Sequence, residues 1–271
     1  MNYCAPGKYD KNVKTCYTLD QLKDIARAYN KHYANNKNAI KLNQNKANLW
    51  AEISHKLSNV CGQEYCWLDQ DYVRNLASHE SLEKMFRPKR PLGKYQWLTT
   101  SNITEVMEQY EYKYPDFNYL GTVPIDFCEV MGVICNTNFP KLYKKGIRRF
   151  GVVFNTDPST EPGKHWISMF INLNNKTINY FDSFAVCPPP QQVLNLVNRI
   201  KSHSTAIYGK PNMIKYRCNP IKHQMANSEC GVYSIYFITE MLKGRGFNKI
   251  TTDIQRDEQM NGRRKIYFRP N

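Results

Sequence analysis

Cys230 is the first residue whose type and position could do chemistry. It follows small polar residues in HQMANSECGVYSIYFI (223–238), at the head of an apolar helical pattern that ends near Lys243 and Gly244. The unpaired amide groups at a helix N-terminus stabilise a thiolate, which is the nucleophilic form of cysteine. Gly231 is expected to leave open space beside the sulfur, so that a substrate backbone can come close. The alternative is one more buried thiol in a chain with nine cysteines.

A thiol nucleophile needs a base, and His165 is the histidine best placed to serve. In GKHWISMF it stands after a Pro-Gly turn, where an apolar strand begins, so it is held rigidly yet open to solvent. The other histidines stand in polar helical segments, past the end of a helix, or in a solvated Lys-His pair before a loop: His32, His55, His79, His203 and His223.

Asp182 is the candidate for orienting that base. It stands in TINYFDSF (177–184), which follows HWISMFINL (165–173) with a turn inside NLNNK. Antiparallel pairing of two strands joined by a short turn brings the end of the second beside the start of the first. Asp182 is therefore predicted beside His165, where a carboxylate fixes the imidazole tautomer and stabilises the imidazolium. A turn cap is the alternative role.

Two side-chain amides could help to bind an oxyanion. Gln224 and Asn227 stand six and three residues before Cys230, on the loop that leads to it. Either could donate an N–H alongside the Cys230 backbone amide, or could simply form the turn. The residues alone leave these alternatives open.

The elements that must position these residues follow a helical N-terminal third. Thr18 and Gln21 form a capping-box pattern at the start of a helix, and 48–57 and 69–86 are further helical candidates. RPKRPLGKYQW (87–97) breaks the periodicity. Beyond it we expect a helix with Ser101 or Asn102 as N-cap, strands at 150–156, 165–173, 177–184 and 212–219, and helices at 191–203 and from 230. This order predicts an α+β fold, with a helical N-terminal domain at 1–90 and a catalytic domain at 91–271.

Composition narrows the class of protein. With 41% hydrophobic residues the chain is globular, no apolar run is long enough to span a membrane, and the first twenty residues lack the apolar core of a secretory signal. Nine cysteines at irregular spacing are then expected to be free thiols in a reducing compartment. A structural zinc site at Cys61 and Cys66 is the lesser alternative, because no second ligand pair follows. The formal net charge of +15 favours phosphate backbones, acidic proteins or anionic membranes without choosing among them.

The order His-Trp, Asp-Ser, Gln and Cys-Gly resembles the Ulp1/adenain superfamily of cysteine proteases. The intervals of 17 residues from His165 to Asp182 and of six from Gln224 to Cys230 fit the SUMO-protease form, which favours Gln224 over Asn227. The stretches FNTDPSTEPGKHW and HQMANSECG are similar to the polyprotein-processing proteases of large nucleocytoplasmic DNA viruses, of the African swine fever virus type. One departure is Asp182, where that type carries Asn.

The resemblance implies a central mixed β-sheet flanked by helices, and a cysteine endopeptidase that cleaves viral structural polyproteins at Gly-Gly-Xaa-like sites during virion maturation. His165 would be the base, Asp182 its orienting group, Cys230 the nucleophile and Gln224 the oxyanion donor, with no metal or cofactor. It further implies action at assembly sites in the host cytoplasm and in the virion, with nucleic acid as a partner that suits the basic charge. The residues expected to contact the substrate are Trp97, Trp166, Gly231 and Asn227. For Trp166, packing in the core is left open as an alternative role.

Two other functions remain as alternatives. The same chemistry could remove a ubiquitin-like modifier of the SUMO type from lysine. A degenerate protease core could instead belong to a non-enzymatic, basic nucleic-acid-binding protein, against which the intact set of four residues argues.

Overall fold

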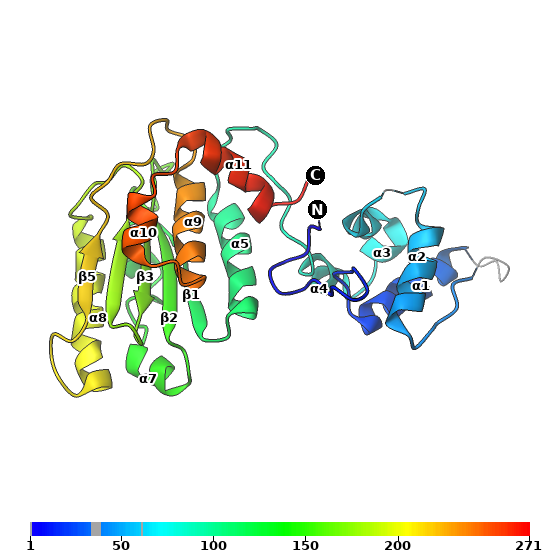
Figure 1. Cartoon of the computed structure of the whole chain (residues 1–271), viewed down its shortest axis with the longest axis horizontal. Coiled ribbons are helices and arrows are strands. Elements are labelled where there is room, and N and C mark those ends of the chain that lie inside the picture. Colours follow the sequence, from blue (N-terminus) through cyan, green and yellow to red (C-terminus); the bar gives the residue numbers. More distant parts are fainter. Residues whose placement is uncertain (1, 34–38, 61) are drawn as a thin grey trace. The chain divides into compact units, whose positions relative to one another are not determined.

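The chain forms two compact units in the computed structural model, which describes residues 2–33, 39–60 and 62–271. The first unit comprises Met1–Lys89 together with Phe268–Pro270, and the second comprises Arg90–Tyr267 with Asn271. Figure 1 shows the helices of the first unit and the sheet of the second. The sequence did not predict that the last residues of the chain would belong to the first unit.

The first unit consists of short helices around its own apolar core. Its helices are α1 (Leu19–Tyr33), α2 (Lys46–Lys56), the 3₁₀ helix η2 (Glu64–Asp69), α3 (Asp71–Arg74) and α4 (His79–Glu83). The capping box before α1 is confirmed, because the Thr18 amide donates to Gln21 Oε1 (2.9 Å) and the Gln21 amide donates to Thr18 Oγ1 (3.2 Å).

The prediction of one helix over 69–86 is wrong, because the segment divides into α3 and α4. Val73 and Leu82 are both fully buried in the same core. Nine residues apart, they would lie on roughly opposite sides of a continuous helix, about 180° apart at 3.6 residues per turn. Breaking the helix lets both side chains reach one core.

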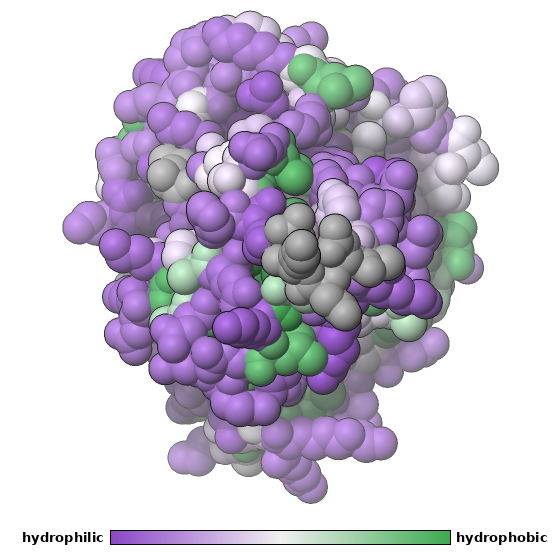
Figure 2. Space-filling model, turned by 90° about the vertical axis from the view of Figure 1, so that its right-hand side faces the viewer, coloured by the Kyte–Doolittle hydropathy of each residue, from purple (hydrophilic) through white to green (hydrophobic). Residues whose placement is uncertain are grey.

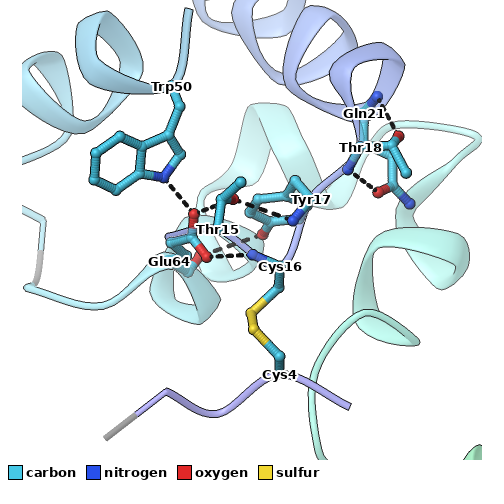
Figure 3. Close-up of a disulfide and its surroundings, with 8 residues drawn as sticks. All are labelled: Cys4, Thr15, Cys16, Tyr17, Thr18, Gln21, Trp50 and Glu64. Carbon is cyan, nitrogen blue, oxygen red and sulfur yellow. Dashed lines mark hydrogen bonds between the residues drawn. A yellow bond between two sulfur atoms is a disulfide. The ribbon is translucent and has the colours of Figure 1, made fainter. Parts of the chain in front are cut away.

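Glu64 and a disulfide hold the start of the chain in this unit (Figure 3). The Glu64 carboxylate accepts hydrogen bonds from the Thr15 hydroxyl, the Cys16 amide (3.0 Å) and the Trp50 indole. Cys16 is joined to Cys4. Burial raises the pKa of Glu64, and these hydrogen bonds only partly offset that shift.

The expectation of free thiols is wrong for most of the described cysteines. Disulfides join Cys4 to Cys16, Cys128 to Cys135 and Cys187 to Cys218, with Cα–Cα distances of 5.3, 5.4 and 6.2 Å. These distances suit a disulfide, and the fold creates them without any regular spacing along the chain. Cys66 is also disulfide-bonded and so is not a zinc ligand. Cys61 lies outside the described residues.

The second unit is built on a five-stranded mixed sheet, as the predicted fold class requires. Its strands lie in the order β1-β2-β3-β4-β5, in which β1 pairs with β2 and β4 with β5 in parallel, and the two central pairs are antiparallel. The strands are β1 (Phe117–Val123), β2 (Arg149–Asn155), β3 (Trp166–Asn172), β4 (Thr177–Phe181) and β5 (Lys215–Cys218). The strand β1 was not predicted, because a register shift at Gly121, where φ is +125°, interrupts its alternation.

Helices cover both faces of this sheet. They are α5 (Thr100–Lys113), α6 (Phe127–Val130), α7 (Phe139–Lys144), α8 (Gln191–Tyr208), α9 (Cys230–Leu242), α10 (Phe247–Thr252) and α11 (Asp257–Tyr267). Val152 of β2 packs in one core with Val193 of α8. Its neighbour Gly151 faces the other way, where an added Cβ would lie 3.1 Å from Ile238 of α9. The alternation of β2 therefore places α8 and α9 on opposite faces.

Thr99, and not Ser101 or Asn102, is the N-cap of α5. Thr99 Oγ1 accepts from the Asn102 amide (3.2 Å), and Asn102 Oδ1 accepts from the Thr99 amide (3.1 Å). These two reciprocal hydrogen bonds place the N-cap of α5 at Thr99, two residues before Ser101.

Among the described residues, no helix is both long and apolar enough to cross a membrane. Outside its grey residues, the face shown in Figure 2 is mostly hydrophilic, with hydrophobic colour confined to small separate areas. In the first unit the exposed large apolar side chains are Tyr33, Leu42 and Val60.

Candidate active site

Cys230 is the first residue of α9, as the sequence predicted. The helix is buried almost all round, and Phe237 stacks on Phe181 of β4 with ring centroids 5.0 Å apart. A helix that is apolar on all sides is held in place by its surroundings. Cys230 is thus fixed at the end of a rigid element, and it is the free cysteine among the described residues.

The β3–β4 hairpin brings His165 and Asp182 together, which confirms the predicted juxtaposition. The strands pair antiparallel with Ser168 opposite Phe181, so His165 just before β3 and Asp182 just after β4 lie at the same end. His165 Nε2 lies 2.7 Å from Asp182 Oδ1. The two side chains are 12% and 3% exposed, so this pair is largely shielded from water.

His165 interacts with Asp182 and Cys230 together. Burial lowers the pKa of His165, but hydrogen bonds with Asp182 and Cys230 and the charges of both groups outweigh burial and raise the pKa to about 9. Because Nε2 faces Asp182, the other ring nitrogen is left for the thiol. At neutral pH the imidazole is therefore mainly protonated.

Two residues that the sequence analysis did not name support this pair. The Phe184 amide donates to Asp182 Oδ1 (2.8 Å), and the Phe184 ring stacks on His165 with centroids 4.7 Å apart. Asn219 Nδ2 donates to the Asp182 carbonyl (3.0 Å). Phe184 could have been anticipated, since extending the hairpin ladder by three positions sets it opposite His165.

Gln224 is fully buried, and both ends of its side-chain amide are engaged. Ser183 Oγ donates to Gln224 Oε1 (2.6 Å), and Gln224 Nε2 donates to the Ala226 carbonyl (2.6 Å). The Gln224 backbone amide also donates to the Ser183 carbonyl (3.0 Å). The residue after Asp182 thus fixes the orientation of this amide.

The loop between Gln224 and Cys230 is held by α11. Asp257 Oδ2 accepts from the amides of Met225 and Ala226, each at 2.9 Å. Glu229, next to Cys230, accepts two hydrogen bonds from Arg264 at 2.9 and 3.1 Å. No local sequence pattern predicts these contacts, because each joins residues more than 30 positions apart in the chain.

The four residues expected at the substrate have different surroundings. Trp97 is 40% exposed and Asn227 is also exposed, so both are accessible. Trp166 is 7% exposed and donates its indole N–H to the Leu98 carbonyl (2.9 Å), which fits the packing role left open for it.

The expectation of open space at Gly231 is wrong. A Cβ at this position would lie 3.0 Å from Leu98 Cβ and 3.3 Å from Ile103 Cδ1. Successive residues on a helix point about 100° apart, so Gly231 does not face where Cys230 faces. The glycine permits close packing of α9 and does not make room for a substrate.

His223 is also placed differently from expectation, because it is fully buried and not a solvated residue. Its Nε2 lies 3.0 Å from the Thr251 carbonyl, and its Nδ1 accepts from the Gln255 amide (3.3 Å). Burial lowers the pKa of His223. These contacts give it a structural role beside the loop.

Within residues 2–33, 39–60 and 62–271, no group of three or more His, Cys, Asp or Glu side chains could hold a metal ion.

Comparison with known proteins agrees with this arrangement. Residues 152–270 match the Ulp1 protease family, C-terminal catalytic domain. The protein R355 of Acanthamoeba polyphaga mimivirus, whose name describes it as a thiol protease, is 32% identical over 99% of this chain and 94% of its own length. The cysteine protease S273R of African swine fever virus is 28% identical over 77% of this chain and 83% of its own length.

The fold is likewise shared with a solved structure. The crystal structure of the African swine fever virus pS273R protease superposes with a TM-score of 0.73 at 23% identity, covering 100% of this chain and 96% of that one. The chain therefore belongs to the Ulp1 family of cysteine proteases, together with the viral thiol proteases that it resembles along most of its length.

Proposed function

We propose that this enzyme is a cysteine endopeptidase that cleaves viral structural polyproteins at Gly-Gly-Xaa-like sites during virion maturation. The observation that carries the proposal is the alignment of Asp182, His165 and Cys230, with 2.7 Å between the first two and the thiol at the start of α9. The viral thiol and cysteine proteases among its relatives support proteolysis by a cysteine nucleophile. Action at assembly sites in the host cytoplasm and in the virion follows from those substrates.

The chemistry begins with a thiolate and an imidazolium. The raised pKa of His165 keeps the ring protonated at neutral pH, and a positive charge beside a cysteine stabilises its thiolate form. Cys230 Sγ attacks the scissile carbonyl carbon, and the C=O electron pair moves onto the oxygen. The Cys230 backbone N–H and the second hydrogen of Gln224 Nε2 would then bind that oxyanion.

Collapse of this tetrahedral intermediate breaks the C–N bond. His165 gives its proton to the leaving amine, which leaves an acyl-enzyme on Cys230 and a neutral imidazole. The imidazole then takes a proton from water, whose oxygen attacks the thioester carbonyl and releases the acid product. Throughout this sequence Asp182 holds the ring by Nε2 and stabilises its charged form.

The first test is substitution of the proposed nucleophile and base. Cys230→Ser and His165→Ala are each expected to lower kcat/KM for a Gly-Gly-Xaa polyprotein fragment by about 10⁴-fold or more while the far-UV circular dichroism stays unchanged. His55→Ala, an exposed histidine on α2, is the matched control and should keep full activity. Turnover by Cys230→Ser close to that of the unsubstituted enzyme would contradict the mechanism.

The substrate class is tested separately. A relative in African swine fever virus bears the name SUMO-1 cysteine protease, so removal of a ubiquitin-like modifier is the second candidate function. Incubation of the enzyme with a lysine-linked SUMO conjugate and with the virus's own structural polyprotein, read by mass spectrometry, distinguishes them. Cleavage of the polyprotein after glycine supports the proposal, and cleavage of the conjugate alone overturns it while leaving the chemistry in place.

A further inference from the structure

An exposed lysine on the loop before Cys230 lies next to the aromatic ring that stacks on His165. Lys222 Nζ is 5.3 Å from the centroid of the Phe184 ring, within the range of a cation–π contact. The same ring stacks on the His165 imidazole, with centroids 4.7 Å apart. One aromatic side chain therefore contacts both the proposed base and a cation that the mechanism does not use.

Hydrogen bonds hold the segment that carries Lys222 against the segment that carries Phe184. The amides of the next two residues, His223 and Gln224, both donate to the Ser183 carbonyl, at 2.9 and 3.0 Å. Ser183 Oγ also donates to Gln224 Oε1 (2.6 Å). Because Ser183 directly precedes Phe184, the backbone of Lys222 cannot move away from the aromatic ring without breaking these bonds.

The charge of Lys222 is not neutralised by a carboxylate, in contrast to that of the lysine directly before His165. Lys164 Nζ lies 3.4 Å from Asp157 Oδ1 and 3.2 Å from Glu161 Oε2. Within the part of the chain that the structure describes, Lys222 forms no ion pair, and it is exposed. Between these two lysines, Lys222 is therefore the one whose charge is available to a substrate.

The chemistry of His165 indicates which part of a substrate meets Lys222. The imidazolium gives its proton to the leaving amine, so the leaving-group residues lie beside this ring while the acyl part stays on Cys230. An extended chain advances about 3.3 Å per residue, so its second and third leaving-group residues lie roughly 7–10 Å from the scissile bond. Lys222 Nζ lies within the same range of the imidazole, because the two contacts with the Phe184 ring allow no larger separation.

Both segments that meet at Lys222 are open to solvent. Val186, two residues after Phe184, is 56% exposed, and Met225, three residues after Lys222, is 66% exposed. Phe184 itself is half-buried. An extended peptide can therefore reach the cation and contact accessible apolar side chains on the same two segments.

An acidic side chain is the complement of a lysine without a carboxylate partner. A carboxylate within about 4 Å of the ammonium is attracted, and a cationic side chain in the same place is repelled. We propose that Lys222 selects substrates with Asp or Glu at the second or third position on the leaving-group side of the scissile bond. The inference rests on the proposed endopeptidase function and adds a requirement beyond the Gly-Gly-Xaa sequence.

The test uses three peptides that share one Gly-Gly-Xaa sequence and carry Glu, Gln or Lys at both the second and the third leaving-group positions. The unsubstituted enzyme is expected to show kcat/KM about fivefold higher for the Glu peptide than for the Lys peptide, the scale of exposed charge interactions. The difference should lie in KM, because the pairing is made on binding, and added salt should reduce it. Lys222→Glu should reverse the order of the peptides.

Lys210→Glu is the matched control, because it makes the same change in charge at an exposed lysine just after α8. It should keep the preference for the Glu peptide. Equal cleavage of the three peptides by the unsubstituted enzyme, or an unchanged order in Lys222→Glu, would overturn the inference and leave the proposed function in place. Cleavage of a SUMO conjugate but of none of the peptides would overturn both.

Lys222→Gln serves as the second variant, and it decides the question if the charge reversal does not fold. It removes the charge and keeps a polar side chain at an exposed position. The ratio of kcat/KM between the Glu and Lys peptides should fall close to one in this variant. A ratio equal to that of the unsubstituted enzyme would overturn the inference.

Discussion

Asp182 and His165 are the residues on which the proposed chemistry depends most directly. Their hydrogen bond of 2.7 Å is shielded from water, and the same His165 ring interacts with the Cys230 thiol. A charge held between two partners in a site of low exposure is stabilised more than one at the surface. The protonation state of this one ring therefore controls both the attack and the leaving-group step.

The pH dependence of activity follows from His165. Because its pKa is raised to about 9, activity that needs the imidazolium is expected to fall as pH rises through about 9. Asp182→Asn removes the carboxylate charge, so the alkaline limb of kcat/KM should move to lower pH by more than one unit. An alkaline limb at the same pH in this variant would show that Asp182 does not set the charge of the ring.

The same shift links pH to stability. The folded-state pKa of His165 lies above its ordinary value of 6.5. The stability that the protonated ring provides is therefore complete below about pH 6.5 and is lost as pH rises through about 9. That difference corresponds to about 3 kcal/mol. The free energy of unfolding, measured with urea at pH 6 and at pH 9.5, should decrease less with pH for Asp182→Asn than for the unsubstituted protein. Equal decreases would show that Asp182 does not raise the pKa of His165.

Gln224 is expected to act on kcat and not on KM. Gln224→Ala should lower kcat by about 10²–10³-fold, the usual effect of losing one oxyanion donor, with little change in KM. Asn227→Ala is the control, because Asn227 is exposed and is the alternative oxyanion donor that the family resemblance disfavours. A larger loss from Asn227→Ala than from Gln224→Ala would exchange their roles.

At the scale of elements, the hairpin could be predicted from the sequence and the clamp from α11 could not. Two short runs of apolar residues joined by the NLNNK turn predict the antiparallel pairing of β3 and β4, and with it the place of Asp182. The contacts of Asp257 and Arg264 with the loop before Cys230 depend on how α11 packs, which no local pattern encodes. For the same reason the packing of Gly231 against Leu98 escaped prediction.

Asp257 is expected to position the loop that carries the oxyanion donor. Asp257→Ala removes the acceptor of two loop amides and should lower kcat by about tenfold or more, because misplacement of a catalytic group is costly. Asp257→Asn keeps one acceptor oxygen and should restore part of kcat. Lys249→Ala, an exposed change on the neighbouring helix α10, should have no effect. Equal kcat in Asp257→Ala and the unsubstituted enzyme would exclude this role.

At the scale of the whole molecule, the disulfides set the conditions under which the chain is most stable. Cys187–Cys218 closes a loop that contains α8. Replacing both cysteines by serine is expected to lower the free energy of unfolding by about 2–4 kcal/mol under non-reducing conditions. With reductant present the two proteins should unfold at nearly the same urea concentration, and a persistent difference would mean that the serines themselves disturb the packing.

Residues Phe268–Pro270 belong to the first unit, and this matters when the catalytic unit is produced alone. The Arg269 amide donates to the Pro88 carbonyl, and the Arg269 guanidinium lies over the Tyr65 ring. A fragment of residues 91–271 would thus carry residues 268–270 without the unit to which they belong, and Phe268, which is buried in the full chain, would be exposed. Ending the fragment at Tyr267 keeps all of α11, and with it the residues that hold the loop before Cys230. We therefore expect a fragment of residues 91–267 to be more soluble than one of residues 91–271, because it lacks the exposed Phe268.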